Sequence, residues 1–122
     1  MSYTPHKYIR QALVTKLKGL GYSLSGSYPR VELYDFATTQ GAEKNNVSEI
    51  VTCVIEVVDS TDSPKRSLDM IEAIRAGIED LTVSGFSVVI VEPELLTELE
   101  EYSDTDLKIY RQIQRVRFLI NK

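Results

Sequence analysis

The stretch Ser48-Glu-Ile-Val-Thr-Cys-Val-Ile-Glu-Val-Val-Asp59 carries the strongest secondary-structure signal in this chain. β-Branched residues dominate it, and both of its alternating faces are largely apolar. This pattern is typical of a central strand that is covered on both sides for much of its length. The sequence therefore predicts a sheet built around residues 48–59. Cys53, in the middle of this strand, is expected to be a small buried hydrophobic residue and not a reactive thiol.

Two amphipathic helices are predicted on either side of this strand. The first covers residues 5–20, with Pro5 at its first position, apolar residues at helical spacing, and Gly19 and Gly21 at its end. The second starts at Pro64, continues to Leu81 with the same spacing, and is followed by a Ser-Gly pair. Each helix has one apolar face, so both are expected to pack on the sheet.

Three further strands complete the prediction. Residues 30–36 form a first strand, residues 86–91 form a buried strand, and residues 108–120 are assigned to a strand because β-branched residues are frequent there, although a helical stripe also fits them. Residues 37–47 contain little to bury and are expected to form a hairpin connection or a mobile arm. Residues 92–106 are expected to be a solvated acidic strand-loop-strand segment that leads into the last strand.

The element order is then helix, strand, strand, helix, strand, strand. It predicts an α+β fold, with a mainly antiparallel sheet and two helices packed on it. A length of 122 residues and 13.8 kDa fits one domain, residues 1–122. The predicted core combines the apolar faces of the two strongest strands and the second helix: Val51, Cys53, Ile55, Ile71, Ile74, Ile78, Val89 and Val91.

Composition excludes several kinds of chemistry. Eighteen acidic and fourteen basic residues give a net charge of −4, which argues against sequence-independent DNA binding. A single cysteine rules out an internal disulfide and thiolate-based zinc sites, and the single histidine, His6, is expected to be solvated. No apolar run approaches the ~20 residues of a membrane span, and no signal-peptide core is found at the N-terminus. We therefore expect an intracellular protein that is not an enzyme, binds no cofactor and contacts no membrane.

One acidic cluster leaves a catalytic alternative open. Glu92, Glu94, Asp104 and Asp106 could hold Mg²⁺ as in metal-dependent nucleases, and Asp106-Leu107-Lys108 matches half of a common nuclease signature. However, the surrounding stretch has no bases to hold phosphate groups. A solvated acidic surface is therefore the favoured interpretation.

Charge is distributed along the chain in blocks. Residues 92–106 hold seven acids and no base, residues 108–122 hold five bases and no acid, and residues 1–31 hold five bases and no acid. These blocks could pair within one subunit, or they could pair between subunits and fix their register. In the second case, acids of one subunit are expected near bases of the next. The candidate interface residues are Glu98, Glu100 and Glu101 on one side, and Arg111, Arg115, Lys16 and Lys18 on the other.

The chain resembles the tail-terminator (tail-completion) proteins of long-tailed bacteriophages, a group that includes small head–tail joining proteins. The resemblance is carried by the N-terminal helix ending in Gly21, Tyr28-Pro-Arg-Val31, the strand Glu49–Asp59, the helix Leu68–Leu81 and the closing segment Tyr110-Arg-Gln-Ile-Gln-Arg-Val-Arg-Phe118.

This resemblance implies a non-catalytic virion protein of the tail or neck, made in the cytoplasm of a bacterial host. It implies a homo-oligomeric ring, typically a hexamer, with the tail-tube protein and the head-side connector or stopper as partners and with DNA only passing through the lumen. The alternative is a small α+β interaction or regulatory subunit unrelated to phage.

Overall fold

Two α-helices and four strands make up residues 5–40 and 48–121, which are the residues that the computed structural model describes. The predicted α+β class and element order are confirmed. Along the chain the elements are α1 (Pro5–Gly19), β1 (Arg30–Gln40), β2 (Ser48–Asp59), α2 (Lys65–Gly77), the short 3-10 helix η1 (Ile78–Asp80), β3 (Ser87–Tyr102) and β4 (Lys108–Asn121).

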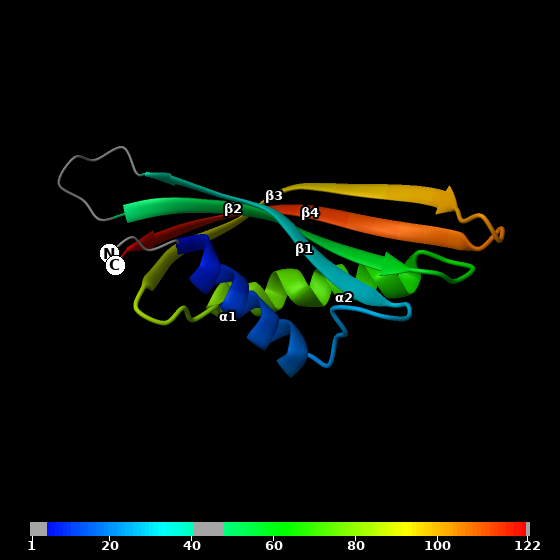
Figure 1. Ribbon diagram of the computed structural model, residues 1–122, viewed down its shortest axis with the longest axis horizontal. Helices are drawn as coiled ribbons and strands as arrows, with labels where there is room; N and C mark the ends of the chain where they lie inside the picture. Colours follow the sequence, from blue (N-terminus) through cyan, green and yellow to red (C-terminus); the bar gives the residue numbers. More distant parts are fainter. Residues whose placement is uncertain (1–4, 41–47, 122) are drawn as a thin grey trace.

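The four strands form one antiparallel sheet in the order β1-β2-β4-β3 (Figure 1). β2 and β4 lie at the centre and pair without interruption, from Ser48 opposite Asn121 to Asp59 opposite Tyr110. β1 and β3 are the two edges. The strand predicted at residues 108–120 is therefore confirmed, and its central position accounts for its high content of β-branched residues.

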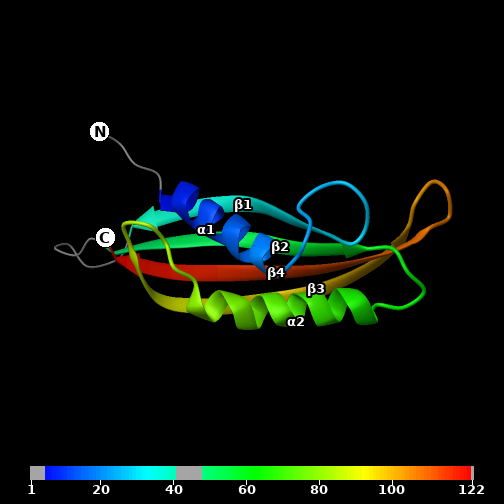
Figure 2. The same ribbon diagram turned by 90° about the horizontal axis from the view of Figure 1, so that it is seen from below.

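Both helices lie against the same face of the sheet (Figure 2). In α1 the side chains of Ile9, Leu13 and Leu17 are fully buried, and α2 and η1 contribute Ile71, Ile74 and Ile78. Six of the eight predicted core residues are confirmed as buried. Val91 is half-buried against this core, and the side chain of Val89 lies outside the described part of the molecule. The sheet contributes eight residues to this core: Val31, Val51, Cys53, Ile55, Val57, Val116, Phe118 and Ile120.

The opposite face of β2 is buried as well, as the sequence predicts. Val54 and Val58 are almost completely inaccessible, although both helices of the described residues lie on the other side of the sheet (Figure 1). Tyr34 of β1 and Arg111 of β4 extend over this face from the neighbouring strands and contact Glu56. Glu56 lies between the two valines and is also buried, so this face holds a charge that requires partners.

β1 is longer than predicted, because residues 37–40 belong to the strand and not to a connection. The register shifts between Tyr34 and Ala37, and Asp35 adopts a positive φ of 55°. Such a bulge changes which face each later side chain occupies, which hides the alternation from the sequence pattern. The remainder of the predicted arm, residues 41–47, lies outside the described residues.

β3 also differs from the prediction, because it continues through the acidic stretch to Tyr102. The predicted strand ended at Val91, with only a solvated acidic segment expected beyond it, and residues 92–102 hold five acids, which have low strand propensity. In the structure, β4 pairs with β3 along this whole length and places basic side chains beside the acids. Cross-strand charge pairing therefore compensates for the poor intrinsic propensity.

His6 is half-buried and not solvated, so this prediction was wrong. Its Nδ1 lies 2.9 Å from Oγ1 of Thr38 on β1, and its ring packs against Phe36 with 6.2 Å between the ring centroids. These contacts connect the first turn of α1 to β1, on both sides of the end predicted for that strand at residue 36.

Candidate interaction surface

Exposed apolar side chains gather on the hairpin formed by β3 and β4. Among the described residues, eight large hydrophobic side chains are exposed, and six of them lie on β3 or in the turn that follows it. Scattered exposed hydrophobic residues are normal, but a cluster on one element indicates a contact surface. We call four of them the β3 edge patch: Leu96 and Tyr102 on the face that the helices cover, Leu99 on the opposite face, and Leu95 at the register shift that precedes Leu96.

The β3 edge patch lies on a regular, open strand edge. β3 has register shifts between Val88 and Ile90 and between Pro93 and Leu96, but residues 96–102 pair with β4 without a break. The other edge strand is partly closed, because the backbone N–H of Val31 in β1 donates to the carbonyl of Ser23 at 2.8 Å. A regular edge with apolar side chains is the kind of strand that another chain can cover.

The three acids of β3 that were predicted at an interface, Glu98, Glu100 and Glu101, find partners within the same chain. Lys108 Nζ lies 2.9 Å from Glu100 Oε1, and Arg111 Nε lies 2.6 Å from Glu101 Oε1. Glu98 accepts a 2.7 Å hydrogen bond from Gln112 Nε2. The acidic and basic blocks therefore pair across the β3–β4 hairpin, which is the within-subunit alternative. A contact of these residues between subunits stays a prediction.

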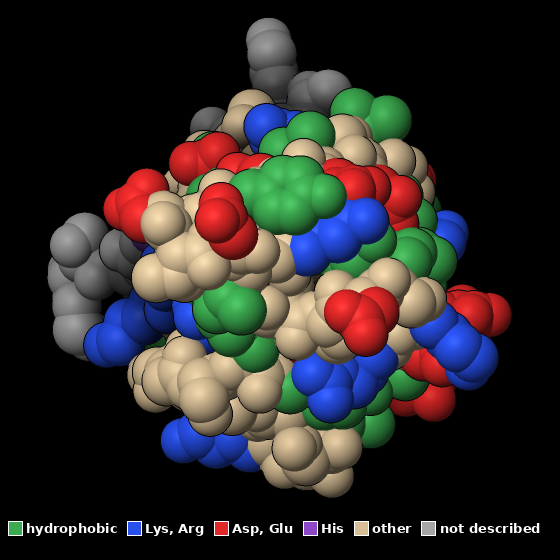
Figure 3. Space-filling view, turned by 90° about the vertical axis from the view of Figure 1, so that its right-hand side faces the viewer, with side chains coloured by type: hydrophobic (Ala, Val, Ile, Leu, Met, Phe, Trp, Pro, Cys, Tyr) green, Lys and Arg blue, Asp and Glu red, His purple; other side chains and the backbone are tan. Residues whose placement is uncertain are grey.

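The pairs at the end of the hairpin are weak individually. Glu100 and Glu101 are about half exposed, and such pairs contribute ~0–1 kcal/mol each. The hydrogen bond to Glu100 raises the pKa of Lys108 above its ordinary value. Figure 3 faces this end of the molecule and shows acidic, basic and hydrophobic side chains mixed together. The acidic segment therefore does not present a uniform negative field.

Arg111 joins a second and more buried set of contacts across the sheet face opposite the helices. Its Nη1 lies 2.6 Å from Glu56 Oε2, and the hydroxyl of Tyr34 donates a 2.5 Å hydrogen bond to Glu56 Oε1. Together with Glu101 these residues form a network with one side chain from each of the four strands. We call Tyr34, Glu56, Arg111 and Glu101 the cross-sheet network.

The cross-sheet network is electrostatically coupled. Burial, followed by the hydrogen bond to Glu56, raises the pKa of Tyr34 to about 12. The hydrogen bonds to Glu101 and then to Glu56 raise the pKa of Arg111. The sequence analysis named Arg111 and Glu101 but missed Tyr34 and Glu56. A glutamate inside an otherwise apolar strand was the available signal, since a buried carboxylate needs a cation and further hydrogen bonds.

The remaining predicted interface residues lie apart from the end of the hairpin. Arg115 is exposed on the sheet face opposite the helices, and Lys16 and Lys18 lie in the last turn of α1, where cations interact favourably with the helix dipole. Figure 1 shows α1 under one half of the sheet and the turn between β3 and β4 at the other end. The structure therefore brings Glu98, Glu100 and Glu101 close to β4 but not to the lysines of α1.

The four acids of the nuclease alternative are also separated. Glu92 is opposite Arg117 in the sheet, whereas Asp104 and Asp106 lie in the turn after Tyr102. Ten residues of extended strand separate Glu92 from Tyr102, or about 30 Å. Within residues 5–40 and 48–121, no three His, Cys, Asp or Glu side chains are grouped closely enough to hold a metal ion.

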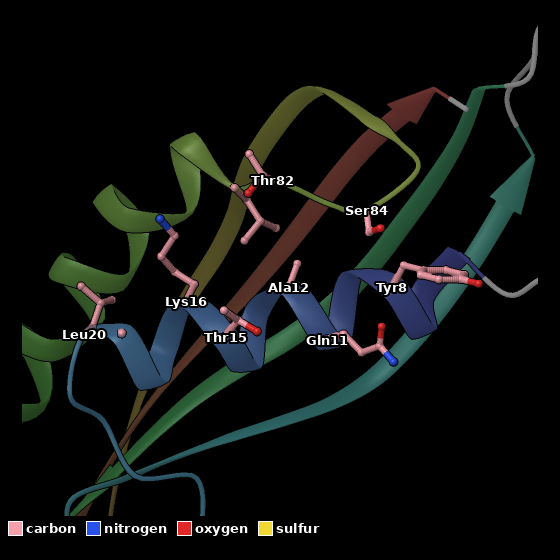
Figure 4. Close-up of a pocket in the computed structure, with 10 residues that line it drawn as sticks. Tyr8, Gln11, Ala12, Thr15, Lys16, Leu20, Thr82 and Ser84 are labelled. Atoms are coloured by element: carbon pink, nitrogen blue, oxygen red, sulfur yellow. The ribbon is translucent and has the colours of Figure 1, made fainter.

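A groove of about 580 Å³ lies between α1 and the segment that leads from η1 to β3 (Figure 4). Tyr8, Ala12, Leu20 and Leu81 give it apolar walls, and Lys16 contributes a cation. Gln11, Thr15, Gly19, Thr82 and Ser84 complete its lining. We call this feature the α1 groove.

No helix in the part of the chain that the structure describes is long and apolar enough to cross a membrane.

Comparison with known proteins relates the chain to solved structures by fold and not by sequence. No family model and no curated protein is significantly similar to the chain in sequence. A chain in the solved structure described as the virion of a native gene transfer agent particle has the same fold, with a TM-score of 0.71. The two chains are 16% identical, and the superposition covers 97% of this chain and 99% of the other.

Proposed function

We propose that this chain is a structural virion protein of a phage-like particle. The observation that supports the proposal is the fold shared with a chain of a gene transfer agent virion, which extends over almost the whole of both chains. This similarity agrees with the sequence resemblance to tail terminators, which rests on different evidence. A structural and not a catalytic role fits the candidate surface, which consists of apolar side chains on a strand edge.

Within the virion, we assign the chain to the junction between tail and head. It forms a ring, hexameric in the family that it resembles, which caps the tail tube and joins it to the head-side connector or stopper. DNA passes through the lumen of this ring. Because retained phosphate contacts require clustered basic groups, the net charge of −4 favours passage without binding.

Deletion of the gene from the genome that encodes the particle tests this assignment. Electron microscopy should then show filled heads and separate tails that fail to join, and the wild-type gene supplied in trans should restore complete particles. Normal particles after deletion would exclude the function. Native mass spectrometry of the purified chain should show a ring, whereas the alternative of a regulatory subunit unrelated to phage predicts a smaller species.

A further inference from the structure

The β3 edge patch and the α1 groove have complementary properties. The patch offers leucines and a tyrosine on an open edge, and the groove has apolar walls formed by Tyr8, Ala12, Leu20 and Leu81. The α1 helix carries four bases and no acid, while the β3–β4 hairpin, residues 87–121, carries seven acids and four bases. Both the apolar surfaces and the net charges therefore favour contact between the two features.

The two features cannot meet within one subunit. Ser87, where β3 begins, follows closely after Ser84 in the groove wall, but Leu96 lies nine residues further along an extended strand. That separation is about 30 Å, and Tyr102 is about 50 Å away. Figures 1 and 2 agree that the segment leading into β3 and the turn after β3 are at opposite ends of the long axis. The contact would therefore have to form between copies.

Contact between two identical β3 edges is disfavoured. A symmetric antiparallel pair centred at Thr97 would place Glu94 opposite Glu100 of the partner, and one centred at Glu98 would place Glu98 opposite its own copy; opposed like charges destabilise strand pairs. Pairing of β3 with the β1 edge of another copy is obstructed by the bulge at Asp35 and by the hydrogen bond from Val31 to Ser23. The α1 groove remains the most suitable acceptor.

We propose that the β3 edge patch of one copy docks in the α1 groove of a second copy. In this contact Leu96 and Tyr102, which share the helix-covered face of β3, pack against the apolar groove walls, and the carboxylate of Glu94 lies near Lys16. Because the two surfaces are different and lie at opposite ends of the subunit, the contact is head-to-tail and generates a closed ring when the rotation between subunits allows it. This inference rests on the proposed function for its ring, but it names surfaces that the proposed function leaves open.

Engineered cysteines test the contact directly. Leu96→Cys and Thr15→Cys place thiols on the patch and in the groove, and the native Cys53 is buried and does not compete. An equimolar mixture of the two single variants should give a disulfide-linked heterodimer, and the double variant should give a ladder of covalent oligomers that reductant reverses. Absence of the ladder would overturn the proposal. Equally efficient dimerisation of Leu96→Cys alone would overturn it as well, since that result indicates a symmetric β3 contact.

Two leucines of nearly equal exposure supply a matched control. Leu96 in the patch is 37% exposed, and Leu68 on α2 is 39% exposed. Leu96→Ser should weaken self-association by about tenfold or more, the loss expected when one buried leucine is removed from an interface. Leu68→Ser should leave association unchanged in sedimentation velocity, with both variants folded by circular dichroism. Equal effects of the two substitutions would contradict the assignment of the patch.

Exchanging the charges of Glu94 and Lys16 tests whether these two side chains lie close together in the contact, beyond the packing of apolar side chains. Glu94→Lys and Lys16→Glu should each weaken association, and the combined variant should recover most of it, with Glu72→Lys on α2 as a neutral control. Failure of recovery would refute the proximity of Glu94 and Lys16.

If native mass spectrometry shows rings while these tests fail, the contact is wrong and the proposed function stands. If deletion of the gene leaves the particles intact, the proposed function fails whatever the cross-links show.

Discussion

Replacement of Arg111 by methionine should lower the free energy of unfolding by about 3–5 kcal/mol, because it leaves a buried carboxylate without its cation. The side chain of Glu56 is 5% exposed, and its Oε2 receives a 2.6 Å contact from Arg111. After the substitution only the hydroxyl of Tyr34 remains as a partner of this carboxylate. Methionine keeps an apolar stem of comparable length, so the loss of packing is small compared with the loss of charge.

Two further variants assign this cost to the buried part of the cross-sheet network. Glu101, the other partner of Arg111, is 46% exposed, so Glu101→Gln should cost less than about 1 kcal/mol. The double variant Glu56→Gln/Arg111→Met removes both charges of this pair and keeps an oxygen for Tyr34. It should recover about 2 kcal/mol or more relative to Arg111→Met alone, the signature of a coupled pair.

Urea denaturation followed by far-ultraviolet circular dichroism measures all four proteins, since the chain has no tryptophan to report unfolding by fluorescence. The midpoint should shift without a change in the slope m. A cost below 1 kcal/mol for Arg111→Met, or an equal cost for Glu101→Gln, would refute the argument that Glu56 is buried and dependent on Arg111.

Three other predictions test the core and the bulge. Ile74→Ala should lower stability by about 2–5 kcal/mol in the same assay, because Ile74 is fully buried. Burial raises the pKa of the Cys53 thiol from about 9 to about 12. The stability that the protonated thiol contributes is therefore complete below pH 9 and is lost as the pH rises from 9 through 12. Between about pH 8 and pH 10.5 the wild type should lose more free energy of unfolding than Cys53→Ala. Asp35→Val should cost about 1–2 kcal/mol in thermal unfolding while Asp35→Gly costs nothing, because residue 35 has a positive φ.

The central strands were predictable because one physical cause determined their sequence. Burial on both faces requires apolar side chains at consecutive positions, so β2 was predicted with its observed bounds, and the β-branched end of β4 was recognised despite a competing helical pattern. Helix α1 was predicted within one residue at its C-terminal end, since Gly21 takes the positive φ that ends it.

The edge strands were predicted less well because their structure depends on partners that local sequence does not specify. Residues 37–40 follow a bulge, so their alternation is out of phase with residues 30–34. Residues 92–102 are a strand because β4 lies beside them and supplies Lys108 and Arg111. A propensity argument applied to one segment at a time cannot include such cross-strand stabilisation.

The candidate interface illustrates the same difficulty with charge. Blocks of opposite sign along a chain suggest contacts between subunits, but Glu100 and Glu101 already contact Lys108 and Arg111 across a hairpin of their own chain. Reversal of Glu98, Glu100 and Glu101 to lysine would therefore disrupt hydrogen bonds that hold the hairpin, and a loss of assembly would not identify an intersubunit contact. The side chains of the hairpin that remain exposed without a partner in the same chain include the leucines of β3. For this reason the substitution of Leu96, and not the reversal of the neighbouring acids, is the perturbation that separates assembly from folding.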